Sequence, residues 1–511
     1  MEPVEERLGD RGRGCFRARE LAAGRGRGRF RARELAAGVA VAAGVGSATT
    51  AGRPAGFARG RDNGRMHARW NQLSPGSSGR RSLLPPHAFV GILAVAIESP
   101  RAPESPRSSI SGVGMRPSGP TENDAFCQTE REERTGVSIR VTILDDVLEA
   151  HPQPDVLVRA PGRANLIGEH TDYNLGYVLP VALELTTYLA GTRRPGVVHL
   201  RSLNEPDEVV IDLERPAERV DGWGGYVSAV VRTLIDEGVP VLGVEGVIGS
   251  SVPLGAGLSS SAALEIALAT ALSPDLAPVH KAQLCRRAEH DYVGVKVGIM
   301  DQLASAAARA DHALLIDCSD NSIEHVPIPR ELAVLIVDSG TGRDLQGSAY
   351  NERRGDCEEA ARALSASSLR DITFDELEDG RDRMGTNAYR RARHVITENE
   401  RVLATVKALS AGEFDEVGDL FAASHRSYAR DFEASLEEID VLVDIARGTP
   451  GVVAARLTGG GFGGCTVNLV QREAAGEAAP AIASAYEDAI RRRARWWVSE
   501  PAAGAGPLEL P

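Results

Sequence analysis

The chain has 511 residues, 42% of them hydrophobic, which is enough for one large or two medium-sized domains. Its formal charge of −13 argues against a general nucleic-acid binder, because such proteins usually carry a basic surface. The longest apolar run, at residues 88–97, is too short to cross a bilayer and too deep in the chain for an ordinary signal peptide. These features predict a protein that binds neither nucleic acid nor membrane. Six scattered cysteines without a CxxC pair add the expectation that it is cytoplasmic.

Residues 1–137 differ from the rest of the chain. They are rich in Arg, Gly, Ala, Ser and Pro and hold 22 Arg against 14 acidic residues, a net charge of +8, so the remainder carries −21. FRARELAAG occurs twice, at 16–24 and 30–38, and no sustained helical or strand period follows. We interpret this segment as a low-complexity tail without a specific function, or as sequence upstream of the true start.

From about Ser138, apolar runs alternate with amphipathic segments and short turns. Strands are predicted at 156–160, 177–183, 187–192, 197–202, 209–213, 243–253, 313–318 and 332–340, and at both ends of 452–470; helices are predicted at 223–238, 260–272, 281–294 and 351–364, then up to about 446, and at 478–493. The pattern predicts an α+β protein with two halves, 138–328 and 329–500, and a short tail, 501–511. The six cysteines are far apart and form no CxxC pair, so we expect reduced thiols.

Ala160–Asn174, APGRANLIGEHTDYN, places charged residues between two apolar runs that we predict to be buried strands. Glu169, His170 and Asp172 suit the recognition of a polyhydroxyl ligand, because a carboxylate accepts hydrogen bonds from two hydroxyls. A buried ion-pair and turn network explains the same residues, with His170 satisfied by a neighbour and Asp172 capping a turn. The stretch alone leaves both interpretations open.

A glycine-rich turn, VPLGAGLSSSAALEIA at 252–267, directly precedes a predicted helix. Backbone N–H groups at a helix N-terminus form an anion site, and glycines allow close approach of a phosphate. The turn lacks the lysine of a GxxxxGK[ST] loop. The alternative is that Ser259 is an ordinary N-cap residue.

Four motifs together resemble the GHMP kinases. PLGAGLSSSAA (253–263) is similar to their phosphate loop, and GRANLIGEHTDYN (162–174) resembles the signature of the galactokinase branch; EHDYVGVKVGIMDQLAS (289–305) and RLTGGGFGGCTVNLV (456–470) also agree, in the family's order. The resemblance covers about 138–500. It implies an N-terminal half like domain 2 of ribosomal protein S5, a ferredoxin-like C-terminal half and an active site between them. The implied reaction is ATP-dependent phosphorylation of α-D-galactose at its 1-hydroxyl, giving galactose 1-phosphate and ADP.

The resemblance also implies roles for individual residues. Asp301 is the expected general base, and Arg163 the cation that stabilises the transition state and keeps Asp301 ionised. The expected sugar contacts are Glu169, His170, Thr171, Asp172, Gly298 and Tyr350. The expected ATP contacts are Ser202, Gly255, Ala256, Gly257, Leu258, Ser259, Ser260 and Ser261. Mg²⁺ is expected on Ser261 and Glu289, and the second glycine loop, 457–465, is expected to pack over the phosphate loop.

Two positions depart from the family pattern. Val297 stands where many galactokinases have cysteine, and Arg343 stands where many have histidine, near the sugar-binding region. Alternatives are therefore a kinase for another sugar, such as N-acetylgalactosamine or L-arabinose, and a non-catalytic sensor of galactose and ATP. The intact GLSSSAA loop argues against a sensor, and GEHTDY argues against another GHMP branch. We expect a monomer whose partners are ATP and a small sugar.

Overall fold

The computed structural model describes residues 140–216, 220–342 and 346–510. The segment 1–137 and Arg343 lie outside these ranges. Within them the chain forms an α+β protein with two large sheets, as predicted, and the first sheet is built mainly from residues before 328 and the second from residues after it.

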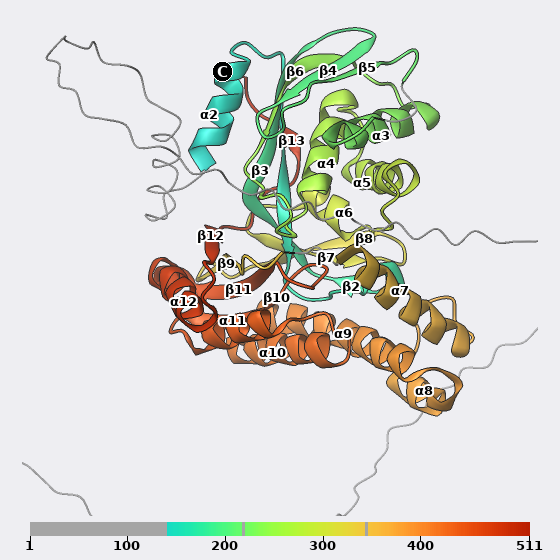
Figure 1. Ribbon diagram of the computed structural model, residues 1–511, viewed down its shortest axis with the longest axis vertical. Helices are drawn as coiled ribbons and strands as arrows, with labels where there is room; N and C mark the ends of the chain where they lie inside the picture. The colour runs from blue at the N-terminus through green and yellow to red at the C-terminus, as the bar shows by residue number, and fades with distance from the viewer. Residues whose placement is uncertain (1–139, 217–219, 343–345, 511) are drawn as a thin grey trace, which may run out of the picture. The chain divides into compact units, whose positions relative to one another are not determined.

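The N-terminal half contains a six-stranded sheet in the order β13-β1-β3-β6-β4-β5 (Figure 1). Its strands are β1 (Val156–Asn165), β3 (Pro180–Arg193), β4 (Val197–Ser202), β5 (Val209–Asp212), β6 (Val244–Ser250) and β13 (Gly506–Pro507). Its helices are α2 (Arg140–Ala150), α3 (Trp223–Asp236), α4 (Ser260–Leu272), α5 (Pro278–Ala288), the π-helical turn η2 (Glu289–Val293) and α6 (Met300–Ala307). A small sheet, β2 (Tyr177–Val178), β7 (His312–Asp317) and β8 (Ser322–Pro327), follows the order β2-β7-β8.

Both faces of the six-stranded sheet are covered, because alternate residues of a strand point to opposite faces. Val158 and Leu189 lie in the large core beneath helices α3–α6. Their chain neighbours Leu157 and Tyr188 lie in a smaller cluster against α2. This explains why β1 and β3 are buried at nearly every position.

The C-terminal half is a four-stranded antiparallel sheet in the order β10-β11-β9-β12 with helices on one face (Figure 1). The strands are β9 (Leu332–Asp338), β10 (Val452–Leu457), β11 (Cys465–Gln471) and β12 (Arg495–Ser499). The helices are α7 (Gln346–Ala363), α8 (Phe374–Asp379), α9 (Thr386–Ala411), α10 (Phe414–Arg430), α11 (Glu437–Gly448) and α12 (Ala475–Ile490), with short 3₁₀ turns at Arg381–Arg383 and Arg472–Ala474. The β-α-β-β-α-β order and the strand arrangement are those of a ferredoxin-like fold, as expected.

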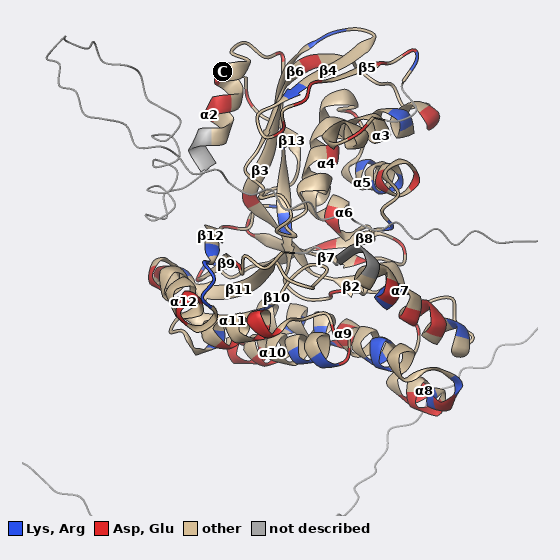
Figure 2. Ribbon diagram, viewed as in Figure 1, with Lys and Arg blue, Asp and Glu red and all other residues tan. Residues whose placement is uncertain are grey.

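A third apolar cluster joins the two halves. It brings Leu166 and Ile167, just after β1, against Ile336 of β9 and Phe421 of α10. Figure 2 shows charged residues gathered on the helices, whereas the strands of the C-terminal sheet carry few. Because Leu166 and Ile167 contact both halves, the segment after β1 is held in their shared core. This sets the position of the charged residues that follow it.

The prediction of a tail at 501–511 is wrong for its described part. β13 pairs with β1 through Val158 opposite Pro507, and Leu508 N–H donates to Leu157 O at 2.9 Å. Ala502 N–H also donates to Ala182 O. The segment thus returns from the C-terminal half to complete the edge of the N-terminal sheet.

Four cysteines lie in the part of the chain that the structure describes, and all four are buried and outside any disulfide, namely Cys285, Cys318, Cys357 and Cys465. None of the described helices combines the length and the apolar character that a membrane span needs.

A chain that ends at Glu500 should unfold at a lower temperature than the full chain. It loses the β1 pairing and the backbone hydrogen bonds of Ala502, Gly504, Ala505 and Leu508. At roughly 1 kcal/mol each, these bonds predict a fall in melting temperature of about 4 °C or more. Calorimetry tests this against a chain ending at Leu508, which keeps the strand. Equal melting temperatures for both truncations would show that the strand adds no stability.

Candidate active site

A bidentate ion pair between Arg163 and Asp301 lies at the centre of the site. Arg163 is near the end of β1, and Asp301 is in the first turn of α6. Arg163 Nη2 lies 2.7 and 2.8 Å from the two oxygens of Asp301, and Arg163 Nε lies 2.9 Å from Oδ1. Arg163 is 5% exposed, whereas the Asp301 side chain is 25% exposed. The arginine therefore holds the carboxylate from its buried side and leaves part of the carboxylate accessible to a ligand.

The glycine–serine loop is attached to this pair. Arg163 Nη1 donates to Gly257 O at 2.6 Å, and Arg163 N–H donates to Leu258 O at 3.0 Å. Gly255, Gly257 and Ser259 all have positive φ, which curves the backbone before α4. The side chains of Ala256 and Leu258 are buried, so the loop presents backbone to a ligand.

Ser259 does not use its hydroxyl as a cap. It precedes α4 in the left-handed conformation and makes no side-chain capping bond. Its Oγ donates instead to Asp301 Oδ2 at 2.5 Å. The interpretation of Ser259 as an ordinary N-cap is therefore wrong, and the serine joins the glycine–serine loop to the aspartate.

Asp172 lies beside this centre. It begins the 3₁₀ turn η1 (Asp172–Asn174), and its Oδ1 accepts the Tyr173 N–H at 2.9 Å. A Cβ at position 298 would overlap its carboxylate, so Gly298 is required for the two to meet. Burial, and then the charge of Asp301, raises the pKa of Asp172 to about 6. The rings of Tyr350 and His170 are 5.2 Å apart and border the same region.

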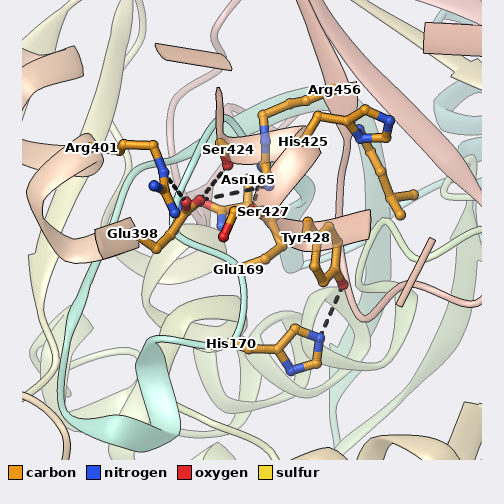
Figure 3. A network of polar contacts seen from close by, with 12 residues as sticks. Asn165, Glu169, His170, Glu398, Arg401, Ser424, His425, Ser427, Tyr428 and Arg456 are labelled. Atoms are coloured by element: carbon orange, nitrogen blue, oxygen red, sulfur yellow. Dashed lines mark hydrogen bonds and ion pairs between the residues drawn. The ribbon is translucent and has the colours of Figure 1, made fainter. Parts of the chain in front are cut away.

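Glu169 is held by groups of the C-terminal half (Figure 3). It is 1% exposed and pairs with Arg456 of β10. Its Oε1 accepts from Gly459 N–H at 3.1 Å and lies 3.3 Å from Thr458 Oγ1. Desolvation, opposed by Arg456, raises the pKa of Glu169. The contacts of Glu169 therefore agree with the alternative interpretation, a buried ion-pair network.

His170 and Thr171 also have protein partners. Tyr428 donates its proton to Gly459 O at 2.7 Å, so its oxygen accepts from His170 Nε2 at 3.0 Å. His170 Nδ1 then accepts from Tyr173 Oη at 2.8 Å. Burial lowers the pKa of His170 to about 3, which keeps the ring neutral. Thr171 is fully buried, and its hydroxyl lies 2.8 Å from Gly168 O, so it holds the turn.

The two residues expected to hold Mg²⁺ are close together. Ser261 Oγ and Glu289 Oε1 are 3.5 Å apart, and Gln302 Nε2 donates to Glu289 Oε2 at 2.8 Å. Burial, and then Asp301, raises the pKa of Glu289 to about 7. Two oxygen donors suit Mg²⁺, which prefers a few carboxylate ligands together with phosphate and water. No group of three or more His, Cys, Asp or Glu residues in the described chain is arranged as a metal site.

Ser202 and the second glycine loop make contacts that the sequence did not indicate. Ser202 Oγ accepts from the N–H groups of Asn204 and Glu205, at 3.1 and 3.2 Å, and so closes a turn after β4. The loop after β10 contacts the Glu169 turn through Thr458 and Gly459. It thereby ties the C-terminal sheet to the signature.

A cavity of about 300 Å³ opens beside α3 and η2. Its lining includes Gly222, Gly225, Tyr226, Arg232, Tyr292 and Val293. Burial, and then Glu289 and Glu265, raises the pKa of Tyr226 to about 12, so this wall of the cavity is near the candidate Mg²⁺ ligands. Sequence reasoning did not identify it.

Sequence reasoning also missed Glu398, Tyr428 and Gln302, and gave no role to Arg456. A signal for Glu398 exists in α9. The polar residues Arg391, His394, Glu398 and Thr405 recur at helical spacing and are all buried. A polar stripe on the apolar face of a helix indicates a buried network, but it does not identify the partners.

Family models match in three places. The GHMP kinase N-terminal domain matches residues 225–309, the GHMP kinase C-terminal domain matches 405–488, and the galactose-binding signature of galactokinases matches 149–193. The fold and these matches thus define a small-molecule kinase of the GHMP class.

Individual relatives narrow the class. The chain is 45% identical to the galactokinase of Bos taurus and 42% identical to that of Roseiflexus, covering 93% of each and 70% and 69% of this chain. The crystal structure of Lactococcus lactis galactokinase complexed with galactose is 32% identical, with a TM-score of 0.67, over 73% of this chain and all of that one. The chain belongs to the galactokinase family.

The raised pKa of Asp172 predicts a pH-dependent gain of stability in Asp172→Asn. Below about pH 4 the carboxyl is protonated in both folded and unfolded chains, so the wild-type residue costs nothing. Between about pH 4 and 6 the folded chain retains a proton that the unfolded chain loses, and above pH 6 the full cost of the buried charge is present. The free energy of unfolding of the variant, relative to wild type, should therefore rise by about 1–3 kcal/mol between pH 4 and pH 8. We expect a value near the lower end because Asp172 is partly exposed.

Urea unfolding of both chains at pH 4 and pH 8 measures this difference. Asp371→Asn is the matched control, because this aspartate is exposed. A gain for Asp172→Asn that is equal at both pH values would contradict the assigned cause.

Proposed function

We propose that the chain transfers the γ-phosphoryl group of ATP to the 1-hydroxyl of α-D-galactose, giving galactose 1-phosphate and ADP. The observation that carries the proposal is the Asp301 carboxylate, which Arg163 and Ser259 fix between the phosphate loop and Asp172. A sugar hydroxyl that binds between Asp172 and Asp301 lies next to a phosphate on the loop. This is the arrangement that phosphoryl transfer to a sugar needs.

In the proposed reaction, Asp301 accepts the proton of the 1-hydroxyl while the sugar oxygen bonds to the γ-phosphorus. The bond between that phosphorus and the bridging oxygen of ADP breaks, and ADP leaves with the electron pair. Arg163 and the N–H groups at the start of α4 stabilise the negative charge on the transferred group. Because the arginine is already fixed by Gly257 and Asp301, little reorganisation is needed in the transition state.

The sugar contacts that we propose are the Asp172 carboxylate, the Tyr350 side chain and the backbone at Gly298. Glu169 and His170 border this set and hold the turn through Arg456 and Tyr428. Thr171 is proposed to act within the turn only. A buried site that hydrogen-bonds each hydroxyl rejects an epimer strongly, because its own polar groups are then left unpaired.

For ATP we propose that Gly255–Ser261 binds the phosphates and that the cavity at Tyr226 takes the base. Ser202, the last residue of β4, is retained as a weaker nucleotide contact. Mg²⁺ would be held by Ser261 and Glu289, where it would neutralise phosphate charge. We propose a cytoplasmic monomer. Its catalytic region consists of the halves 138–328 and 329–500 together with the edge strand β13, and 1–137 is dispensable for activity.

Asp301→Asn should lower kcat with galactose by about 10²–10⁴-fold, the range for loss of a general base. Galactose binding should remain measurable by calorimetry, because Asp172 and Tyr350 are unchanged. ADP release by the full chain with Mg-ATP measures turnover, and Asp311→Asn, at an exposed position, is the matched control. Wild-type turnover in Asp301→Asn would refute the role of base. A wild-type chain that binds galactose and ATP without turnover would support a sensor instead.

A further inference from the structure

We propose that Glu398, in the middle of α9, is a positioning residue that fixes the sugar-binding turn from the C-terminal half. The inference rests on the proposed function and adds to it a residue 230 positions away from the turn in the sequence.

Glu398 makes a hydrogen bond directly to the backbone of the signature. Its Oε1 accepts from Gly168 N–H at 3.1 Å, and the side chain is fully buried. Ser424 of α10 donates to the same oxygen, and Arg401 Nε donates to Oε2 at 2.6 Å (Figure 3). Arg456 Nη2 lies 3.8 Å from Oε1 while Nη1 of the same arginine pairs with Glu169. One carboxylate thus connects the turn, α9, α10 and β10.

The turn has a shape that needs such support. Gly168 has φ +103°, and a Cβ there would approach Tyr177 O to 2.7 Å. His170 has φ +62°, which a residue with a side chain rarely adopts. Asp172, which faces Asp301, follows two residues later. A shift of Gly168 would therefore also move Asp172, the proposed sugar contact.

Only an ionised carboxylate satisfies the partners of Glu398, because Gly168, Ser424, Arg401 and Arg456 all present donors to it. Burial alone would favour the neutral acid, but Arg401, His394 and Arg456 outweigh it and lower the pKa of Glu398 to about 2. In Glu398→Gln the amide NH₂ would face a donor, and one partner would lose its acceptor. The turn is then free to shift at Gly168.

The test is steady-state kinetics of the full chain with Mg-ATP and galactose. Glu398→Gln should raise the KM for galactose at least about 10-fold, while the KM for ATP stays within about twofold and kcat falls less than the sugar KM rises. Ser424→Ala removes one donor and keeps the carboxylate, so it should raise the sugar KM about 2–5-fold. Glu400→Gln, an exposed glutamate on the same helix, should behave as wild type.

Loss of stability without a specific role would instead lower the active fraction and leave both KM values unchanged. An unchanged galactose KM in a folded Glu398→Gln chain, or an equal rise of both KM values, overturns the inference. If Glu398→Gln does not fold, Ser424→Ala decides by the same split. A wild-type chain that phosphorylates no sugar would contradict the proposed function itself, which is a separate result.

Discussion

The ion pair between Glu169 and Arg456 is the interaction on which the site depends. Glu169 follows β1 of the N-terminal half, and Arg456 comes from β10 of the C-terminal half. Both side chains are almost completely buried, so neither charge is screened by water. A buried pair of this kind adds little net stability, because desolvation offsets the attraction, but loss of one partner leaves an uncompensated charge. We therefore interpret it as a device that fixes geometry, joining two parts of the chain that each contribute to the site.

A short stretch of chain connects this pair to the groups that we propose to react. Arg163 is in β1, and its guanidinium positions both Asp301 and the glycine–serine loop. Asp172 follows Glu169 by three residues. Gly298 leaves space for its carboxylate, and the hydrogen bonds of Thr171 hold the turn that carries it. The raised pKa values of Asp172 and Glu289 show that carboxylates are packed more tightly than stability alone favours. Such crowding is expected at a functional site where a bound cation offsets the negative charge.

Much of the fold followed from local pattern. Period-2 and period-3.6 apolar segments predicted most strands and helices, and four motifs predicted the family. The strand β13 was missed because two residues carry no periodic signal and its partner, β1, lies about 350 residues away in sequence. The hydrogen bond from Ser259 to Asp301 was missed for a related reason. N-cap preference depends on local sequence, whereas this bond joins residues that are far apart in the chain. Glu398 left only a polar stripe on α9, and its link to Gly168 depends on how the halves meet.

The most direct test of the account is ADP release by the purified full chain with Mg-ATP across galactose, glucose, N-acetylgalactosamine, L-arabinose and fucose. The account predicts the highest kcat/KM with galactose and a product phosphorylated on the 1-hydroxyl. Clear preference for another sugar would contradict the proposed substrate while leaving the phosphoryl-transfer site in place. Absence of ADP release with every sugar, from a chain that binds galactose and ATP, would contradict the catalytic role of Asp301 and Arg163.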